Sequence, residues 1–343
     1  MCSRSKAVKL SNERLCVLGA GSWGTALSIA FAPRFAEIRL WGHDARRARE
    51  MAAARENRTY LPGFFLPQNV HVHSEFAPAL TDAEVVLYVV PSRYLRPTAR
   101  LLRPYLPPQA RLVSAAKGLE EGSLCRMSEV IQEELATGRE RAVAVLSGPA
   151  FAREIAAGEL AAVVIASEDP ALAEEMQHTL ATPQLRFYAS TDVVGVELGA
   201  ALKNVIAIGA GVCSGLGMGS NTTAALVTRG LAEITRLAVK MGGQPRTLSG
   251  LAGLGDLVLT TTGSLSRNRQ VGMQLGQGCK LSEILQGMRA VAEGVGTCRA
   301  TYLLGQREGV DLPIINKMHE ILYQEKDPRE AIRELMERPL TME

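Results

Sequence analysis

The sequence has little of what several large classes of protein require. Aromatic residues make up 5% of the 343 residues, and 38 Lys and Arg nearly balance 35 Asp and Glu. Nucleic-acid binding uses aromatic faces for stacking and a concentrated basic surface, so this composition argues against a nucleic-acid partner. The longest apolar runs, such as 85–90 and 160–166, are far shorter than the ~20 residues that cross a bilayer. We therefore expect no membrane span.

Cysteine and histidine are also sparse. The six cysteines contain no C-x-x-C pair, and only His71 and His73 of the five histidines lie close together. Such spacing indicates neither a disulfide framework nor a zinc site, and we expect no bound metal. Residues 1–14 are polar and basic, without the apolar stretch of a signal peptide. The sequence thus predicts a reduced, cytoplasmic protein.

Glycine, by contrast, is plentiful, at 32 residues or about 9% against a usual ~7%. Short apolar runs alternate with helical stretches over the first half, a pattern typical of a parallel sheet covered by helices. The expected strands are 15–18, 38–41, 85–90, 111–114 and 143–146, with 163–166 and 185–188 at an edge. The predicted fold class is α/β, with an N-terminal Rossmann domain whose doubly wound sheet is mostly parallel.

From about residue 193 the pattern becomes helical. The run 193–212 predicts a buried helix, and 222–241 has apolar positions at spacings of three and four. Further helices are expected at 280–286, 296–305, 314–323 and 328–337. We therefore predict a dinucleotide-binding domain over 1–192 and an all-helical substrate-binding domain over 193–343. They should be tightly docked, because no linker-like stretch separates them.

A glycine motif follows the first expected strand. Gly19, Gly21 and Gly24 match G-x-G-x-x-G and open a helix. In this context the first glycine permits the turn, the second admits a pyrophosphate, and the third allows helix–strand packing. The free N–H groups at the helix start then face the phosphates. The alternative is a glycine turn without a ligand.

The second strand bears on the choice of dinucleotide. An acidic residue there holds a ribose 2′-OH, whereas a cation accommodates a 2′-phosphate. His43 ends the strand, Asp44 follows, and Arg46 and Arg47 come next. This mixture favours NADP(H), or both NADP(H) and NAD(H), over strict NAD. Alternatively, the two arginines form a solvated helix face.

Lys203 lies in the otherwise apolar segment 200–208. Burial of an ammonium lowers its pKa, which suits a lysine to proton transfer near neutral pH. Lys203 is therefore the candidate proton donor for reduction of a ketone, and Asn204 beside it is placed to orient a hydroxyl. A surface lysine with an extended side chain is the alternative.

Three further polar groups are candidates for a ligand site. Arg267 is suited to a phosphate, with Ser266 and Asn268 completing its shell, although a Ser-capped helix with a basic first turn explains the same residues. Asp256 is expected to pair with Lys203 or to accept a substrate hydroxyl. Lys117 and the turn 147–152 each follow a strand, at the sheet edge where open α/β sheets bind ligands.

Together these motifs resemble the bacterial-type NAD(P)-dependent glycerol-3-phosphate dehydrogenases. The resemblance extends from about residue 15 to 335. The segments that carry it are 19–24 (GAGSWG), 117–120 (KGLE), 147–152 (SGPAFA), 201–204 (ALKN), 221–226 (NTTAAL), 228–233 (TRGLAE), 253–257 (GLGDL), 266–269 (SRNR) and 292–295 (AEGV).

The resemblance implies reversible reduction of dihydroxyacetone phosphate to sn-glycerol 3-phosphate with NAD(P)H, for phospholipid synthesis, by a homodimer. It makes Lys203 the proton donor and acceptor, and puts Lys117 and Arg267 between cofactor and substrate. The implied cofactor positions are Gly19, Gly21, Ser22, Trp23, Gly24, His43, Lys117, Ala152, Arg267, Val291 and Glu293. The implied substrate positions are Lys117, Gly148, Ala150, Lys203, Asp256, Ser266, Arg267 and Asn268, with Thr260 at the same turn.

Two positions depart from the family pattern. Ala150 stands where many members carry a hydroxyl or amide, so its contact would come from the backbone. Thr223 stands where relatives often have a basic residue. Two other functions remain open: a related dehydrogenase acting on a β-hydroxyacid or sugar-acid phosphate, and a non-catalytic nucleotide sensor. A triose-phosphate site at Arg267 argues against the first, and Lys203 together with Asp256 argues against the second.

Overall fold

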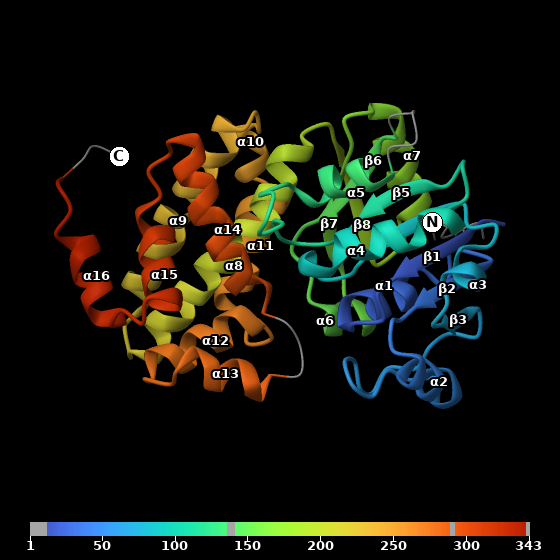
Figure 1. The fold of residues 1–343 in the computed structure, drawn as a ribbon, viewed down its shortest axis with the longest axis horizontal. Helices are drawn as coiled ribbons and strands as arrows, with labels where there is room; N and C mark the ends of the chain where they lie inside the picture. The colour runs from blue at the N-terminus through green and yellow to red at the C-terminus, as the bar shows by residue number, and fades with distance from the viewer. Residues whose placement is uncertain (1–11, 136–140, 289–291, 341–343) are drawn as a thin grey trace, which may run out of the picture.

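The computed structural model describes residues 12–135, 141–288 and 292–340, which form a sheet half and a helical half side by side (Figure 1). The sheet has the strand order β3-β2-β1-β4-β5-β6-β7-β8, and neighbouring strands are parallel except β6 and β7. The strands are β1 (Arg14–Leu18), β2 (Glu37–Trp41), β3 (Val70–His73), β4 (Val85–Tyr88), β5 (Arg111–Ser114), β6 (Val143–Ser147), β7 (Ala161–Ala166) and β8 (Leu185–Ser190). The predicted doubly wound, mostly parallel sheet is confirmed.

Helices cover both faces of this sheet. They are α1 (Ser22–Phe31), α2 (Ala45–Ala54), α3 (Phe76–Leu80), α4 (Ser92–Leu102), η1 (Arg103–Tyr105), α5 (Met127–Leu135), α6 (Ala152–Ala156) and α7 (Pro170–Leu180). One core packs α1, α6 and α7 on the sheet, and a second packs α3, α4 and α5 on its other face. Central strands such as β4 are buried on both faces, which explains their unbroken apolar runs. Strand β3 was not predicted, because two histidines in four residues hide its pattern.

The helical half begins directly after β8. Its elements are α8 (Val193–Gly215), α9 (Ser220–Lys240), α10 (Pro245–Leu248), the π-helical turn η2 (Leu251–Gly255), α11 (Asp256–Thr262), α12 (Arg267–Gly276), α13 (Leu281–Gly287), α14 (Glu293–Glu308), α15 (Pro313–Tyr323) and α16 (Pro328–Met336). The predicted all-helical second half is confirmed. Helix α11 was not predicted, since its motif was assigned to a polar cluster. For α12 the Ser-capped helix was given only as the alternative, and the structure contains it.

Helix α8 is the centre of this half, with α9, α11, α12 and α14 packed around it. Within the described residues it alone is long and apolar enough to cross a bilayer. However, 94% of its most apolar window is buried inside the protein, as expected of a core helix. Its length lets one element carry both core contacts and buried polar side chains.

The closest helix–helix approach in the core joins α8 to α12. A Cβ on Gly272 would lie 1.9 Å from the backbone oxygen of Ile208, and one on Gly211 would lie 2.0 Å from that of Arg269. Only hydrogen fits between these backbones. This contact positions the N-terminal turn of α12, which carries Arg267.

We expect Gly272→Ala to destabilise the protein by about 1–3 kcal/mol, because the added methyl must push two backbones apart. Denaturant unfolding measures the change. Gly287→Ala is the matched control: it is also a helical glycine, but its Cβ meets nothing within 4 Å. The control should change the free energy of unfolding by no more than about 1 kcal/mol. Equal stability of Gly272→Ala and the parent would contradict the packing account.

Candidate active site

A cavity of about 1250 Å³ is lined by residues of both halves. It runs from the glycine turn after β1, past the end of β2, to side chains of α8, α11 and α12. Its walls in the sheet half lie at the carboxyl ends of β1 and β4, where the strand order reverses direction. Ligands of open α/β sheets bind at this topological switch point.

The glycine turn after β1 has the geometry of a dinucleotide cradle. Gly19 has φ +125°, and a Cβ there would lie 2.9 Å from the Val89 backbone. A Cβ on Gly24 would lie 2.0 Å from the Gly19 oxygen, whereas the space around Gly21 is open within 4 Å. Helix α1 starts at Ser22, so its first N–H groups lack intrahelical acceptors. These features fit a bound pyrophosphate.

Of the polar residues after β2, one caps a helix, one lines the cavity and one pairs at the surface. Asp44 is the N-cap of α2, with its Oδ1 accepting from the N–H groups of Arg46 and Arg47 at 3.0 Å. These hydrogen bonds hold the pKa of Asp44 below its usual value. Arg47 lines the cavity and donates to the Tyr60 hydroxyl at 2.7 Å, whereas Arg46 pairs with Glu50. The solvated-face interpretation therefore describes Arg46 but not Arg47.

A three-residue charge cluster joins the two halves. Lys203 from α8 donates to Oδ1 of Asp256 at 2.5 Å and to Oγ1 of Thr260 at 2.7 Å. Lys117, which follows β5, donates to Oδ2 of the same carboxylate at 2.7 Å and to the Gly148 carbonyl at 3.2 Å. Two lysine side chains thus share one buried carboxylate.

Lys203 is 5% exposed, which excludes the surface-lysine interpretation. Burial lowers the pKa of its amine to about 7; the attraction of Asp256 opposes this shift, and the like charge of Lys117 adds to it. A group with this pKa exchanges a proton readily near neutral pH. Because Lys203 also lines the cavity, its amine is accessible to a small ligand there.

The start of α12 carries a second polar group. Ser266 is the N-cap and accepts from the N–H of Arg269 at 3.2 Å, so the capped-helix interpretation holds for this side chain. Asn268 donates to Oδ1 of Asn204 at 2.9 Å and accepts from the N–H of Gly294 at 3.0 Å. Arg267 lines the cavity and makes no hydrogen bond or close ion pair to any residue the structure describes. Burial lowers the pKa of its guanidinium, and the nearby carboxylate of Glu293 opposes this shift.

Glu293 begins the neighbouring helix α14, whose Gly294 N–H binds Asn268, and its carboxylate accepts a hydrogen bond from the Ser92 hydroxyl at 2.7 Å. Burial raises the pKa of this carboxyl above its ordinary value. Trp23 also lines the cavity, and its buried Nε1 has no hydrogen-bond partner among the described residues. Val291 lies outside the residues that the structure describes.

Most of the predicted site residues lie on one surface. The cavity is lined by Gly19, Gly21, Ser22, Trp23, His43, Lys117, Ala150, Ala152, Lys203, Ser266, Arg267, Asn268 and Glu293. Gly24, Gly148 and Asp256 do not line the cavity but contact residues that do: Gly24 packs against Gly19, Gly148 binds Lys117, and Asp256 binds Lys203. The sequence motifs did not identify Tyr60, Tyr94 and Arg153, which also line the cavity. Tyr60 lies in a turn, whereas Tyr94 and Arg153 lie in helices α4 and α6. All three lie outside the motifs that carry the family resemblance, and only their aromatic or basic character marked them.

This fold and this site define a two-part, dinucleotide-dependent oxidoreductase. Models of the NAD-dependent glycerol-3-phosphate dehydrogenase N-terminus and C-terminus match residues 14–173 and 192–333. The chain is 50% identical over 331 residues to a glycerol-3-phosphate dehydrogenase [NAD(P)+] of Geobacter sp. (strain M21), covering 96% of this chain and 99% of the relative. A relative of the same name from Koribacter versatilis is 49% identical over 333 residues, with coverage of 96% and 99%.

The crystal structure of glycerol-3-phosphate dehydrogenase from Coxiella burnetii superposes with a TM-score of 0.91 at 36% identity, covering 95% of this chain and 99% of that one. The chain therefore belongs to the NAD-dependent glycerol-3-phosphate dehydrogenase family, and it uses NAD(P).

We expect Arg47→Ala to raise KM for NADPH by about 10-fold or more while changing KM for NADH little. Loss of a hydrogen-bonded cation opposite a 2′-phosphate costs about 1.5–3 kcal/mol. Steady-state kinetics with NADPH and with NADH measures the two KM values separately. Arg46→Ala is the matched control and should leave both constants unchanged. An equal effect of Arg47→Ala on the KM values of the two nucleotides would contradict the assignment of Arg47 to the 2′-phosphate.

Proposed function

We propose that the cavity is the site where dihydroxyacetone phosphate and sn-glycerol 3-phosphate are interconverted, with Lys203 exchanging the proton. One observation carries this proposal: a buried amine, paired with Asp256 at 2.5 Å, lines the same cavity as the dinucleotide cradle. When bound, the dinucleotide supplies hydride to the carbonyl carbon or accepts it in the reverse direction. The phospholipid-supply role follows from the family.

Lys203 gives its proton to the oxygen that becomes the alcohol, and takes it back during oxidation. Asp256 keeps the ammonium oriented after proton return, and the Thr260 hydroxyl accepts a second N–H of Lys203. Asn204, anchored through Asn268, is placed to orient a substrate hydroxyl. The low exposure of these groups excludes water from the proton transfer.

Binding of the phosphate group is assigned to Arg267, Ser266, Asn268 and Lys117, since Arg267 is a planar donor that lines the cavity and makes no hydrogen bond to a carboxylate among the described residues. The backbone around Gly148 and Ala150 completes the substrate site. Cofactor contacts are assigned to Gly19, Gly21, Ser22, Trp23, Gly24, His43, Lys117, Ala152, Arg267, Val291 and Glu293. Arg47 selects for NADP(H), and Tyr60 supports it.

Three further proposals concern the whole chain. We place the domain boundary between residues 192 and 193, and infer a cytoplasmic homodimer from the family resemblance. Sedimentation should give twice the 36.8 kDa of one chain, and a monomer at micromolar concentration would contradict the dimer. Cell fractionation that finds the protein outside the cytoplasm would contradict the location.

Purified protein should oxidise NADPH or NADH when given dihydroxyacetone phosphate. With unphosphorylated dihydroxyacetone, kcat/KM should fall by at least about 10³-fold, because Arg267 is then left without its anion. Absorbance at the nicotinamide band follows both reactions. Comparable turnover of the two ketones would refute a phosphate-binding role for α12.

Lys203→Met should lower kcat by about 10²–10⁴-fold while the affinity for NADPH, measured by fluorescence titration, is retained. In the parent enzyme, reduction needs the ammonium and oxidation needs the free amine. With a pKa of about 7 for Lys203, kcat/KM for reduction should fall as pH rises through about 7, and that for oxidation should rise. Near-parental turnover in Lys203→Met would show that another group is the acid.

A further inference from the structure

The segment between β5 and α5 is part of the sheet half by sequence but packs into the helical half. Residues 119–126, which we call the strut, close on themselves through an antiparallel bridge between Leu119 and Arg126. The N–H of Glu120 donates to the Cys125 carbonyl at 3.0 Å. Leu119 is buried within the helical core, and Leu124 packs against that core. The strut therefore spans both halves.

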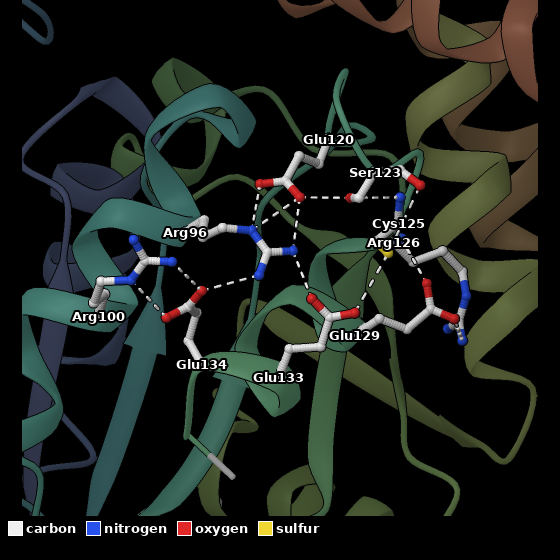
Figure 2. Close-up of polar contacts among 9 residues, drawn as sticks. All are labelled: Arg96, Arg100, Glu120, Ser123, Cys125, Arg126, Glu129, Glu133 and Glu134. Carbon is white, nitrogen blue, oxygen red and sulfur yellow. Dashed lines mark hydrogen bonds and ion pairs between the residues drawn. The ribbon is translucent and has the colours of Figure 1, made fainter.

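Arg96 of α4 holds the strut on the sheet side. Figure 2 shows its guanidinium between three carboxylates: it donates to Glu120 at 2.7 Å, to Glu133 at 2.6 Å and to Glu134 at 2.9 Å. The Ser123 hydroxyl donates to the same Glu120 carboxylate at 2.5 Å. Glu120 thus fixes the first part of the strut to α4, which in turn is joined to α5.

Glu197 of α8 holds the other end. Its Oε2 accepts from Nη1 of Arg126 at 2.8 Å and from the Ser128 hydroxyl at 2.6 Å, and its Oε1 accepts from the Ser128 N–H at 2.8 Å. Glu197 is 4% exposed and Arg126 is 7% exposed. A buried pair of this kind fixes geometry, since either charge left alone is costly. Neither Glu197 nor Arg126 is among the described residues that line the active-site cavity.

The two ends of this arrangement lead to the two active-site lysines. Lys117 precedes Leu119 by two residues, and Lys203 follows Glu197 by six, about 9 Å along α8. We propose that Glu197 is a positioning residue for the reaction: through Arg126 of the strut and Ser128 of α5 it fixes the strut to α8, and so holds Lys117 against the carboxylate that Lys117 shares with Lys203. This inference rests on the proposed function of Lys203.

The arrangement has a measurable electrostatic consequence. Lys203 faces Asp256 from α11 and Lys117 from the sheet half, while Arg267 of α12 and Glu293 of α14 line the same cavity. The positive charge of Lys117 contributes to the lowered pKa of Lys203. If Lys117 moves away, the pKa of Lys203 rises, since it loses a like charge and keeps the whole carboxylate.

The test is the pH dependence of dihydroxyacetone phosphate reduction by Glu197→Gln. Glutamine keeps the size and one acceptor of glutamate but removes the charge that Arg126 needs. We expect kcat to fall by about 10-fold or more, because the reacting groups are displaced. We also expect the alkaline limb of the profile to move up by about 0.5–1 pH unit.

Glu129→Gln is the matched control, because Glu129 pairs with the same arginine at 2.7 Å from a half-exposed position. It should retain the parental profile. Leu124→Ala loosens the strut without changing a charge, and should reproduce the upward shift if Glu197→Gln does not fold. An unshifted limb in whichever of the two variants folds would overturn the inference, even if activity falls. Failure of the proposed function is separate, since it appears as turnover by Lys203→Met.

Discussion

The carboxylate of Asp256, buried between Lys117 and Lys203, is the interaction on which the site depends. One lysine comes from the sheet half and the other from the helical half, so the carboxylate joins the halves at the place where the reaction occurs. Three charged groups out of water are stable only with good geometry and full hydrogen bonding. The Gly148 carbonyl and the Thr260 hydroxyl supply the additional partners.

Helix α8 fixes the relative positions of several of these side chains. It carries Glu197, Lys203 and Asn204 on one rigid element, while the glycines of its C-terminal part let α12 approach closely. The approach brings the polar start of α12 to the wall that Lys203 lines. Packing in the core and placement of the phosphate-binding residues are therefore linked, and a methyl group far from the reaction can disturb both.

The sequence was sufficient to predict elements with strong local signals. Short segments rich in apolar and β-branched residues identified seven strands, and G-x-G-x-x-G in its strand–helix context identified the cradle at Gly19. Strand β3 was missed because it is an edge strand with only Val70 fully buried. The family resemblance, rather than periodicity, selected most of the side chains that line the cavity.

What the sequence could not provide were pairings between distant positions. Glu197 and Arg126 are 71 residues apart, and neither has a local pattern that indicates burial or a partner. Asp44 entered the sequence analysis only as the acidic residue near the end of the second strand, because its N-cap hydrogen bonds depend on where α2 begins. Ser266 both caps α12 and lines the cavity. A serine before a helix has the same sequence signature in either role, so only the fold shows that Ser266 lies at the cavity.

The most direct measurement is the titration of the Lys203 amine itself, by its pH-dependent reaction with a trace of acetic anhydride, read by mass spectrometry against the exposed Lys280 as reagent standard. The account predicts half-maximal reactivity near pH 7, and a lower midpoint in Asp256→Asn, where the opposing carboxylate charge is gone. A midpoint near the ordinary lysine value of about 10.4, unchanged by Asp256→Asn, would contradict it.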